Sequence, residues 1–581
     1  MKKKILAVIL SGFIVLASGI TIGVFYLSST RYKYVHSINW SFPRNCTFHS
    51  DYITIPYLVS MRDTIQLATD VHIPRDINNS LPIVLIRTPY NKNNIGSFIQ
   101  TYTQRGYIVV IQDTRGFHGS EGEKGFPFSF AQVDGHDTLS WLEKQPWSNK
   151  KVGTWGGSAL GITQYLMAPN APESLKCQLP IVGSPDLYNV IFKGGQLRRE
   201  LIIPWMEGNG YSEEAIMHVI LNEKLSEIWD PMRIQENYEQ VNTASMHFGG
   251  WYDIFSQGTI DAFLGYQYKG GDLAQGNAKL VMGPWLHGNF YGGPTGEMEF
   301  PNQDAAIVTN IADAVFDKWL RGDSTLWDHY PTILFYLMSS VEYNPSNVAN
   351  RWYRAEGWPI SVNTTDLYLS LDEGSEPYGL LGTPNDPVYN SVEWEWNPEN
   401  PIVTIGGNNL VIAAGIYDQA AIENRSDIII FETPELSEAL TVVGQINITL
   451  YVSSNCTDTD ITVKLTDVYP DGRSMLVTDT ILRVRNRNTL SDWEFMEPDT
   501  IYGITIPLES TAYLFNVEHQ IRLIISSSNY PRFETNPNTG DPLWQNNTYF
   551  VAKNKVYCNT THPSLISLPT VDYGSLQQFV F

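Results

Sequence analysis

Short, uninterrupted apolar runs recur along the first half of the chain. Residues 83–86, 107–112 and 152–155 are runs of the kind that form buried strands of a parallel sheet. Segments 133–145 and 159–167 have the character of helices. Because strands that alternate with helices form a parallel sheet with helices on its faces, this part of the chain is predicted to be an α/β domain.

The alternation stops at residues 187–243, where the sequence indicates a block of helices without strands. Apolar runs of the sheet type resume at 245–248 and 279–282, and a helix is expected at 305–320. We therefore expect a doubly wound, mostly parallel sheet within residues 45–345, with the helical block inserted into it as a cap.

Beyond about residue 350 the pattern changes to an alternation of apolar and polar positions. Examples are residues 446–452, 461–465 and 521–526, which lie between turns rich in Pro, Gly, Asn and Asp. Repeated short strands of this kind predict an all-β sandwich of the jelly-roll or immunoglobulin-like type. We expect it to occupy residues 350–581 as a separate C-terminal domain.

The N-terminal segment has the pattern of a membrane anchor or a signal peptide. Three lysines at positions 2–4 precede an uncharged run from residue 5 to residue 30. A signal peptide has an apolar core of about 7–15 residues, whereas a membrane span needs about 20, so the run suits an anchor. The lysines favour an N-terminus inside the cell, whereas Ala17-Ser18-Gly19 offers a cleavage site. Residues 1–35 are therefore predicted to anchor or export the chain, and membrane contact is expected through them alone.

Composition narrows the range of partners. Of the 581 residues, 43% are hydrophobic and 17% are charged, which fits a folded protein of more than one domain. Asp and Glu number 61 against 38 Lys and Arg, which gives a net charge of −23. A surface of that charge repels nucleic acid and anionic lipid, so neither is an expected partner.

Sequons and cysteines agree with export from the cytoplasm. The four cysteines have the wrong spacing for a zinc site. In an oxidising compartment Cys456 and Cys558 are the favoured pair, and free buried thiols are the alternative. The sequons lie at Asn45, Asn78, Asn363, Asn424, Asn447, Asn455, Asn546 and Asn559.

Three small residues, Gly156-Gly157-Ser158, join the predicted strand at 152–155 to the predicted helix at 159–167. Strand, tight turn and helix is the geometry that exposes a serine hydroxyl on a sharp elbow. A serine is a weak nucleophile unless it is exposed and has a base beside it. Ser158 is therefore a candidate nucleophile, although Gly-Gly-Ser is also ordinary turn chemistry.

Asp253 and His287 are the candidate acid and base. In a parallel α/β hydrolase the three groups follow one another in the order Ser, Asp, His, from loops after successive strands. Asp253 follows the strand at 245–248 and His287 follows the strand at 279–282, so both are expected at the carboxyl edge of the sheet. A surface carboxylate and a core histidine are the alternatives.

Acyl transfer also needs hydrogen-bond donors for an oxyanion. One is expected to be the N–H of Ala159, the residue after the candidate nucleophile. The other candidate is the hydroxyl of Tyr90, in the loop after the strand at 83–86. A packing role is the alternative, since the chain holds 32 tyrosines.

Several motifs occur in order along the two predicted domains. They are Arg87-Thr-Pro-Tyr90, Gln112-Asp-Thr-Arg-Gly116, Gly119-Ser-Glu-Gly122, Asp134-Gly-His-Asp137, Gln145-Pro-Trp-Ser-Asn149, Gly156 to Gly161, Gly250-Trp-Tyr-Asp253, Gly283-Pro-Trp-Leu-His287, Lys464 to Arg473, Ser526 to Phe533 and Asn536-Pro-Asn-Thr-Gly540. Over about residues 50–575 the chain resembles the cocaine esterase and Xaa-Pro dipeptidyl-peptidase family of α/β hydrolases. That family includes glutaryl-cephalosporin acylases and α-amino-acid ester hydrolases.

The resemblance implies an α/β hydrolase with a helical cap and a C-terminal jelly roll. Acyl transfer by a serine needs no metal or organic cofactor, so none is expected. It implies Ser158 as nucleophile, His287 as base and Asp253 as the acid that orients the base. It also implies an oxyanion hole from Tyr90 and the N–H of Ala159. Many members carry Tyr directly after the nucleophile, so Ala159 predicts an acyl pocket that is larger or differently shaped.

The sequence therefore predicts an exported serine hydrolase that acts on a small ester or a short peptide, in first place an acyl esterase. A dipeptidyl-peptidase or an α-amino-acid ester hydrolase is the alternative, and either must bind a free amine. Asp186 or Glu200 could serve as its partner, and solvated surface charges are the alternative interpretation of both. Trp251 and Trp285 are further candidates for substrate contact. A non-catalytic surface binding protein is the alternative from another class, since fold alone does not define function.

Overall fold

The computed structural model describes residues 47–75, 79–303, 305–342, 348–360, 363–371, 379–384, 389–545 and 548–581. The predicted anchor or signal segment at 1–35 lies outside these residues, as do Cys46 and the sequons at Asn45, Asn78 and Asn546. Within the described part of the chain, no helix is long and apolar enough to cross a membrane. Export therefore stays a prediction from the sequence.

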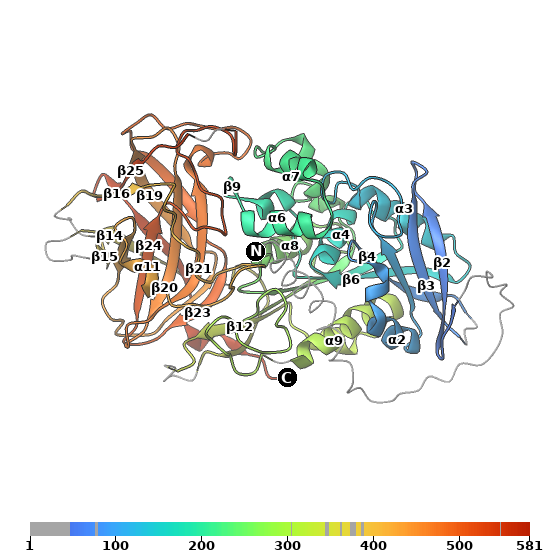
Figure 1. Ribbon diagram of the computed structural model, residues 1–581. Helices are drawn as coiled ribbons and strands as arrows, with labels where there is room; N and C mark the ends of the chain where they lie inside the picture. Colours follow the sequence, from blue (N-terminus) through green and yellow to red (C-terminus); the bar gives the residue numbers. More distant parts are fainter. Residues whose placement is uncertain are drawn as a thin grey trace.

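A mostly parallel sheet forms the centre of the N-terminal part (Figure 1). Its strands are β1 Thr47–Phe48, β2 Tyr52–Ser60, β3 Gln66–Pro74, β4 Leu81–Thr88, β5 Ile108–Asp113, β6 Ser148–Gly157, β7 Leu175–Ile181, β10 Ala244–Gly250, β11 Ala278–Gly283, β12 Ile333–Ser339 and β13 Arg351–Ala355. They lie in the order β1-β2-β3-β5-β4-β6-β7-β10-β11-β12-β13, parallel from β5 to β12 and antiparallel at both ends. The predicted fold class is confirmed.

Helices cover both faces of this sheet. The main ones are α2 Gly96–Gln104, α3 Ala131–Glu143, α4 Ala159–Met167, α8 Ser256–Lys269 and α9 Ala305–Phe316. Successive residues of a strand point to opposite faces. In β4, Ile83 and Leu85 pack into a cluster with residues of α3, whereas Val84 and Ile86 pack into the main core with residues of α2 and α9. The sheet is buried on both sides, which explains its continuous apolar runs.

The insertion between β7 and β10 corresponds to the predicted cap, and we keep that name for it. It contains α5 Leu187–Ile191, β8 Phe192–Lys193, β9 Gln196–Leu197, α6 Arg199–Gly208 and α7 Glu213–Ile220, followed by short 3-10 turns at Glu227–Met232 and Tyr238–Gln240. The expectation that this block lacks strands is wrong, because β8 and β9 pair as a hairpin. Its turn residues Gly194 and Gly195 have φ of 55° and 79°, and a Cβ on Gly194 would lie 2.2 Å from Ile481 O. Glycine lets the turn approach the C-terminal domain closely.

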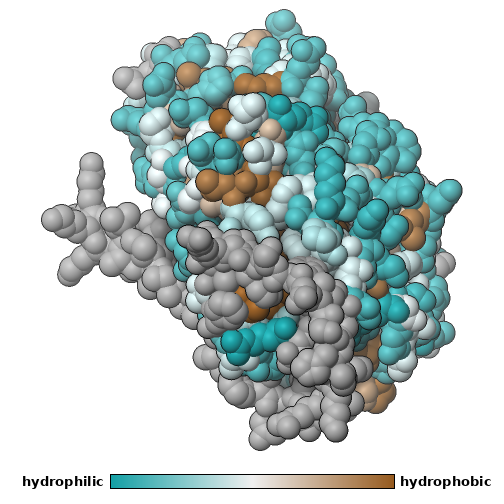
Figure 2. All heavy atoms as spheres, turned by 90° about the vertical axis from the view of Figure 1, so that its right-hand side faces the viewer, coloured by the Kyte–Doolittle hydropathy of each residue, from teal (hydrophilic) through white to brown (hydrophobic). Residues whose placement is uncertain are grey.

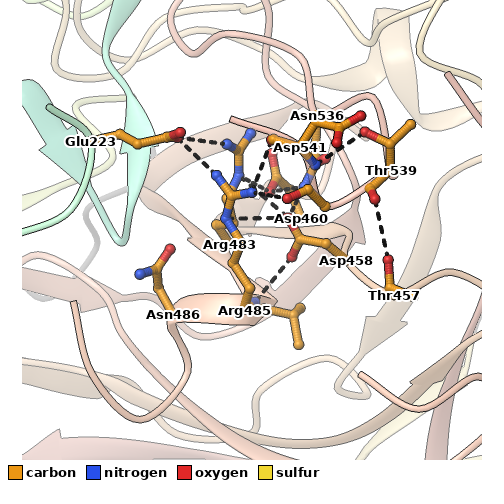
Figure 3. A network of polar contacts seen from close by, with 12 residues as sticks. Glu223, Thr457, Asp458, Asp460, Arg483, Arg485, Asn486, Asn536, Thr539 and Asp541 are labelled. Atoms are coloured by element: carbon orange, nitrogen blue, oxygen red, sulfur yellow. Dashed lines mark hydrogen bonds and ion pairs between the residues drawn. The ribbon is translucent and has the colours of Figure 1, made fainter. Parts of the chain in front are cut away.

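A buried cluster of charges joins the cap to the C-terminal domain (Figure 3). Glu223 of the cap accepts a hydrogen bond from Arg485 Nη2 at 2.8 Å and lies 3.7 Å from Arg483 Nη1. Asp460 accepts from Arg483 Nε at 3.1 Å, and Asp458 accepts from the backbone N–H of Arg485 at 3.0 Å. All five side chains are at most 3% exposed. Removing one partner from this buried cluster would leave an unpaired buried charge, which is strongly unfavourable.

Short strands make up the C-terminal domain. They are β14 Asn363–Ser370, β15 Gly379–Gly382, β16 Ser391–Trp396, β17 Ile429–Glu432, β18 Leu440–Gly444, β19 Asn447–Ser454, β20 Asp460–Val468, β21 Ser474–Arg483, β22 Tyr502–Pro507, β23 Thr511–Phe515, β24 Gln520–Ser526, β25 Ala552–Asn559, β26 His562–Pro563, β27 Leu565–Thr570 and β28 Gln577–Gln578. One run of paired strands is β21-β20-β24-β17-β15-β14, and another is β16-β25-β19-β22. The predicted all-β domain is confirmed.

Strand pairing continues across the junction of the two domains. β12 pairs in parallel with β23 through Met338 and Tyr513, and β13 pairs with the last strand, β28, through Tyr353 and Gln578. β13 therefore still extends the first sheet, although it lies beyond the predicted boundary near residue 345. The junction is built from backbone hydrogen bonds as well as side chains.

The predicted Cys456–Cys558 disulfide does not form in the structure. The Cys456 thiol instead contacts Asn455 Oδ1 at 3.4 Å. β19 and β25 pair antiparallel, with Ser454 opposite Asn554. Cys456 lies just beyond that end of the ladder and Cys558 lies four residues into it, so the two are separated by roughly 20 Å at about 3.4 Å per residue. A disulfide needs Cα atoms within about 7 Å.

The outer face beside β2 and β3 is mostly polar. Figure 2 shows this face, at the right-hand side of Figure 1, with hydrophilic side chains over most of the visible part and hydrophobic ones in small separate patches. Leu58 of β2, for example, is 59% exposed. Scattered exposure of this kind is normal on a protein surface.

Candidate active site

Ser158 lies on a sharp turn between β6 and α4. Its φ is 59° and its ψ is −127°, a conformation that residues with a side chain rarely adopt. The turn is held because the Ser158 N–H donates to Ile181 O at 3.0 Å. A Cβ on Gly156 would lie 2.5 Å from Leu160 Cβ, and a Cβ on Gly161 would lie 3.1 Å from Ile181 O. Gly156 is therefore required by the close approach of strand and helix, and Gly161 leaves little room for a side chain, as the elbow geometry demands.

The structure brings Asp253 and His287 into contact. They lie in the loops after the adjacent parallel strands β10 and β11, whose last residues, Gly250 and Gly283, are paired. His287 Nδ1 and Asp253 Oδ2 are 2.5 Å apart, and the two residues are 7% and 0% exposed. The other carboxylate oxygen, Oδ1, accepts from the Phe255 N–H at 2.8 Å. The carboxylate is thus held on both oxygens and orients the imidazole ring.

The second ring nitrogen, His287 Nε2, is buried and has no hydrogen-bond partner among the described residues. Phe255 packs against the imidazole with ring centroids 5.5 Å apart, and Phe255 and Ser158 line the same pocket. Phe255 therefore connects His287 to the serine pocket, whereas His287 Nε2 makes no hydrogen bond to Ser158. Contacts between catalytic groups are often long in an empty site and tighten when substrate binds.

Tyr90 follows β4 and points its hydroxyl toward the serine. The hydroxyl oxygen accepts from Trp205 Nε1 at 2.8 Å and is also hydrogen-bonded to the Ser158 side chain. Burial raises the pKa of Tyr90 to about 12, although the bonds to Trp205 and Ser158 lower it in part. The hydroxyl therefore keeps its proton at neutral pH and can donate it in a hydrogen bond. Ala159 is the first residue of α4, so its N–H has no acceptor within the helix.

The pocket beside Ser158 is apolar. No charged side chain lines it, and its walls come from the catalytic domain, the cap and the C-terminal domain. The lining residues are Pro127, Phe128, Ser158, Ala159, Ile162, Leu187, Val190, Ile191, Leu201, Ile202, Trp205, Ile254, Phe255 and Leu410. An uncharged apolar group suits such a pocket, because an ammonium or carboxylate would lose its hydration there without a partner.

Asp186, a predicted substrate contact, is occupied by other groups. It caps the N-terminus of α5, where it accepts from the Asn189 N–H at 3.2 Å and from Asn189 Nδ2 at 2.6 Å. Gln235 Nε2 donates to it at 2.6 Å, and Arg233 Nε lies 3.2 Å away. This carboxylate is fully bonded and neutralised, and it does not line the pocket. Because Asp186 caps the helix, its carboxylate has no free oxygen for a substrate amine.

Trp251 and Trp285 also lie outside the pocket lining. Trp251 donates from Nε1 to Tyr336 O at 2.8 Å and is 3% exposed. Trp285 is fully buried, with its ring stacked on Phe248 at 4.7 Å. Both side chains are buried in the hydrophobic core, so their proximity in sequence to Asp253 and His287 does not bring them to the pocket.

Glu200 of α6 borders the pocket through its neighbour Leu201. Its Oε2 accepts from the backbone N–H groups of Leu410 at 3.3 Å and Val411 at 3.1 Å. Its Oε1 is buried without a hydrogen-bond partner among the described residues. Glu200 thus bonds the C-terminal segment that carries Leu410 into the pocket wall.

Two residues that shape the site were not predicted from the sequence. Trp205 lies 115 positions from the Tyr90 that it bonds, and Leu410 comes from the C-terminal domain. No local motif marks either one, since their placement depends on how the cap and the C-terminal domain pack. Over the described ranges, no group of three His, Cys, Asp or Glu side chains is placed to hold a metal ion.

Comparisons with known proteins agree with this geometry. The family model described as X-Pro dipeptidyl-peptidase (S15 family) matches residues 63–215 and 209–289. The model of the X-Pro dipeptidyl-peptidase C-terminal non-catalytic domain matches residues 326–567. The cocaine esterase of Rhodococcus sp. (strain MB1 Bresler) is 30% identical over 580 residues, which cover 88% of this chain and 98% of the esterase.

Solved structures show the same fold. An α-amino acid ester hydrolase superposes with a TM-score of 0.76 at 23% identity, over 90% of this chain and 97% of the hydrolase. An aminopeptidase from the marine sediment archaeon Thaumarchaeota archaeon also gives a TM-score of 0.76 at 23% identity, over 93% of this chain and 100% of the aminopeptidase. At these identities the likeness concerns the fold alone.

The fold and the family matches together define a serine hydrolase of the α/β-hydrolase class. More narrowly, the chain belongs to the family of its cocaine esterase relative, and its two parts match the family models of the X-Pro dipeptidyl-peptidase (S15 family) and of its C-terminal non-catalytic domain. The predicted family and the prediction of an enzyme are confirmed, in preference to a non-catalytic binding protein.

Proposed function

We propose that this chain is an exported serine esterase that hydrolyses esters of apolar, uncharged acyl groups through an acyl-enzyme. The observation that carries the proposal is the pocket beside Ser158, which no charged side chain lines. Export rests on the sequence of residues 1–35. Cell fractionation tests it: the full chain is expected in the membrane or the medium, and recovery in the cytosol alone would contradict export.

In the acylation step, Ser158 Oγ attacks the ester carbonyl carbon while His287 Nε2 takes the hydroxyl proton. Asp253, 2.5 Å from His287 Nδ1, stabilises the imidazolium that forms. The strained conformation of Ser158 keeps its hydroxyl at the open end of the turn between β6 and α4. The alkoxy group then leaves with the proton that His287 returns to it, which gives the alcohol and the acyl-serine.

The oxyanion formed on the carbonyl oxygen receives two hydrogen bonds, from the Tyr90 hydroxyl and from the Ala159 N–H. The bond from Trp205 Nε1 occupies the Tyr90 oxygen as an acceptor, which leaves its proton to be donated. A single donor of this kind contributes about 3 kcal/mol of transition-state stabilisation. Water, from which His287 takes a proton, then attacks the acyl-serine. The same two donors stabilise the oxyanion, and the acid is released.

An ester substrate is favoured over a dipeptide because the site offers little to hold an ammonium group. Asp186 is neutralised by Arg233, and Glu200 uses one oxygen to bond the backbone of Leu410 and Val411. One observation favours a dipeptidyl-peptidase as the second candidate: Glu200 Oε1 has no hydrogen-bond partner among the described residues. An N-terminal ammonium that reached this oxygen would form an ion pair with the buried carboxylate of Glu200.

Steady-state kinetics on two substrate sets separate the candidates. One set is the p-nitrophenyl esters of butyrate, octanoate and benzoate, and the other is the p-nitroanilides of Ala-Pro and Gly-Pro. We expect kcat/KM for the esters to exceed that for the anilides by at least about 100-fold, since the site offers no partner for the ammonium group of the anilides. Ser158→Ala is the control and should abolish both activities.

Faster cleavage of the Ala-Pro anilide would replace the esterase by the dipeptidyl-peptidase. Glu200→Gln then identifies the anchor, because Gln keeps an acceptor for the Leu410 and Val411 N–H groups but removes the charge. Under the esterase proposal this variant retains wild-type activity on the esters. Under the second candidate it loses the peptidase activity alone.

A further inference from the structure

The loop that carries Asp253 is held by a side chain of the C-terminal domain. Asn408 Nδ2 donates to the backbone oxygen of Asp253 at 3.0 Å and to Glu509 Oε2 at 2.7 Å. The same Asp253 oxygen also accepts from the Ser256 N–H at 3.1 Å within the loop. Asn408 and Glu509 are 6% and 5% exposed, so these bonds lie out of reach of bulk water. Buried bonds of this kind fix geometry more firmly than surface ones.

A side chain of the cap holds the next residue of the same loop. Arg198 Nη1 donates to Ile254 O at 2.9 Å, and its Nη2 donates to the backbone oxygen of Asn408. Arg198 is 2% exposed. Two consecutive carbonyl groups of the loop are therefore bonded from outside the catalytic domain, one by the C-terminal domain and one by the cap.

The orientation of the Asn408 amide is set by charge. The Glu509 carboxylate accepts hydrogen bonds and donates none, so it draws one N–H of the amide and leaves the second N–H for Asp253 O. Lys193 of β8 lies 3.3 Å from Glu509 Oε1 and balances its charge. The buried cluster around Glu223 holds the cap and the C-terminal domain together (Figure 3). Arg198 of the cap and Asn408 of the C-terminal domain therefore bond the loop from fixed positions.

We propose that Asn408 is a positioning residue for the acid of the active site. It touches no substrate, and it acts by fixing the backbone from which the Asp253 carboxylate reaches His287. The C-terminal domain, whose family model is described as non-catalytic, would then contribute directly to the reaction rate. The inference rests on the proposed roles of Asp253 and His287. A displacement near 1 Å in such a constellation lowers a rate by up to about 100-fold.

The first test compares Asn408→Ala with a matched control, Asn409→Ala. Asn409 is adjacent and 2% exposed, but its Nδ2 bonds go to Gly406 O and Ala413 O within its own loop, both at 2.7 Å. With p-nitrophenyl butyrate, Asn408→Ala is expected to lower kcat by about 10- to 100-fold with KM within about twofold. Asn409→Ala should leave kcat within about twofold of wild type, since no bond to the catalytic loop is lost.

The second test places Asn408→Ala in an Asp253→Asn background. If Asn408 acts through Asp253, the added substitution lowers kcat by less than about twofold there, because the group that it positions is already disabled. A purely structural role would lower kcat equally in both backgrounds. Thermal unfolding of every variant confirms that each is folded at the assay temperature.

Several outcomes overturn the inference while the proposed triad stands: Asn408→Ala with wild-type kcat, an equal loss in Asn409→Ala, or an undiminished loss in the Asp253→Asn background. Wild-type kcat in Asp253→Asn itself would instead refute the triad. If Asn408→Ala does not fold, Glu509→Gln decides, because it keeps an acceptor for Asn408 but removes the charge that orients the amide. A kcat lowered about threefold at unchanged KM is expected, and wild-type kcat would overturn the inference.

Discussion

Trp205→Phe tests how the cap supports the oxyanion hole. The substitution removes the indole N–H that donates to the Tyr90 hydroxyl at 2.8 Å. It keeps an aromatic ring to stack on Phe128, whose centroid lies 5.5 Å from that of Trp205 at an interplanar angle of 21°. The change is therefore close to the loss of a single hydrogen bond. Without that bond the Tyr90 hydroxyl is free to rotate away from the oxyanion.

The expected magnitudes follow from the bonds that are lost. Tyr90→Phe removes an oxyanion donor, which is worth about 3 kcal/mol, so kcat should fall by about 150-fold. Trp205→Phe removes one neutral hydrogen bond to that donor, which is worth about 1 kcal/mol, so kcat should fall by about 5-fold. KM should change little in either variant, because both bonds act on charge that develops in the transition state.

The assay is a double-mutant cycle on p-nitrophenyl butyrate. If Trp205 acts through the Tyr90 hydroxyl, adding Trp205→Phe to Tyr90→Phe lowers kcat no further. The reasoning would be refuted by an additive loss in the double variant, since Trp205 would then act through packing of the pocket wall. A rise in KM without a fall in kcat in Trp205→Phe would refute it in the same way.

Three further predictions follow from the pocket, the oxyanion hole and the cap. Ala159→Tyr fills the acyl pocket, so the ratio of kcat/KM for the octanoate over the acetate ester should fall about tenfold; an unchanged ratio would place the acyl chain elsewhere. Because burial raises the pKa of Tyr90 to about 12, Tyr90 stays protonated well above neutrality, and kcat should stay level between about pH 8 and 10. A loss of kcat centred near pH 10, the ordinary value for tyrosine, would contradict this. Glu223→Gln removes the carboxylate that faces Arg485 and should lower the free energy of unfolding by about 3 kcal/mol in guanidinium melts, whereas an unchanged midpoint would contradict the docking role of the cluster.

Local sequence patterns predict much of the fold. The helix expected at 159–167 has the bounds of α4, Ala159–Met167, because small residues end the strand just before it and apolar residues follow. Asp253 and His287 were found because residues that follow adjacent parallel strands meet at one edge of the sheet. These inferences need only strand order and polarity.

The features that could not be predicted from the sequence depend on long-range packing. The β8–β9 hairpin has strands of two residues, too short for a hydrophobic period, although its Gly194-Gly195 turn was a visible signal. The register of β19 against β25 separates Cys456 from Cys558, and register cannot be deduced from cysteine counts. Asn408 is 155 positions from Asp253, and nothing local marks their contact.

Ser158 as the nucleophile is the central claim, and covalent labelling tests it most directly. The full chain is treated with a fluorophosphonate, digested, and analysed by mass spectrometry for the modified peptide. We predict a single phosphonyl group on Ser158 and no labelling of Ser158→Ala, because a serine reacts with this reagent only when a base activates it. Labelling at another serine, or undiminished labelling of Ser158→Ala, would contradict the account.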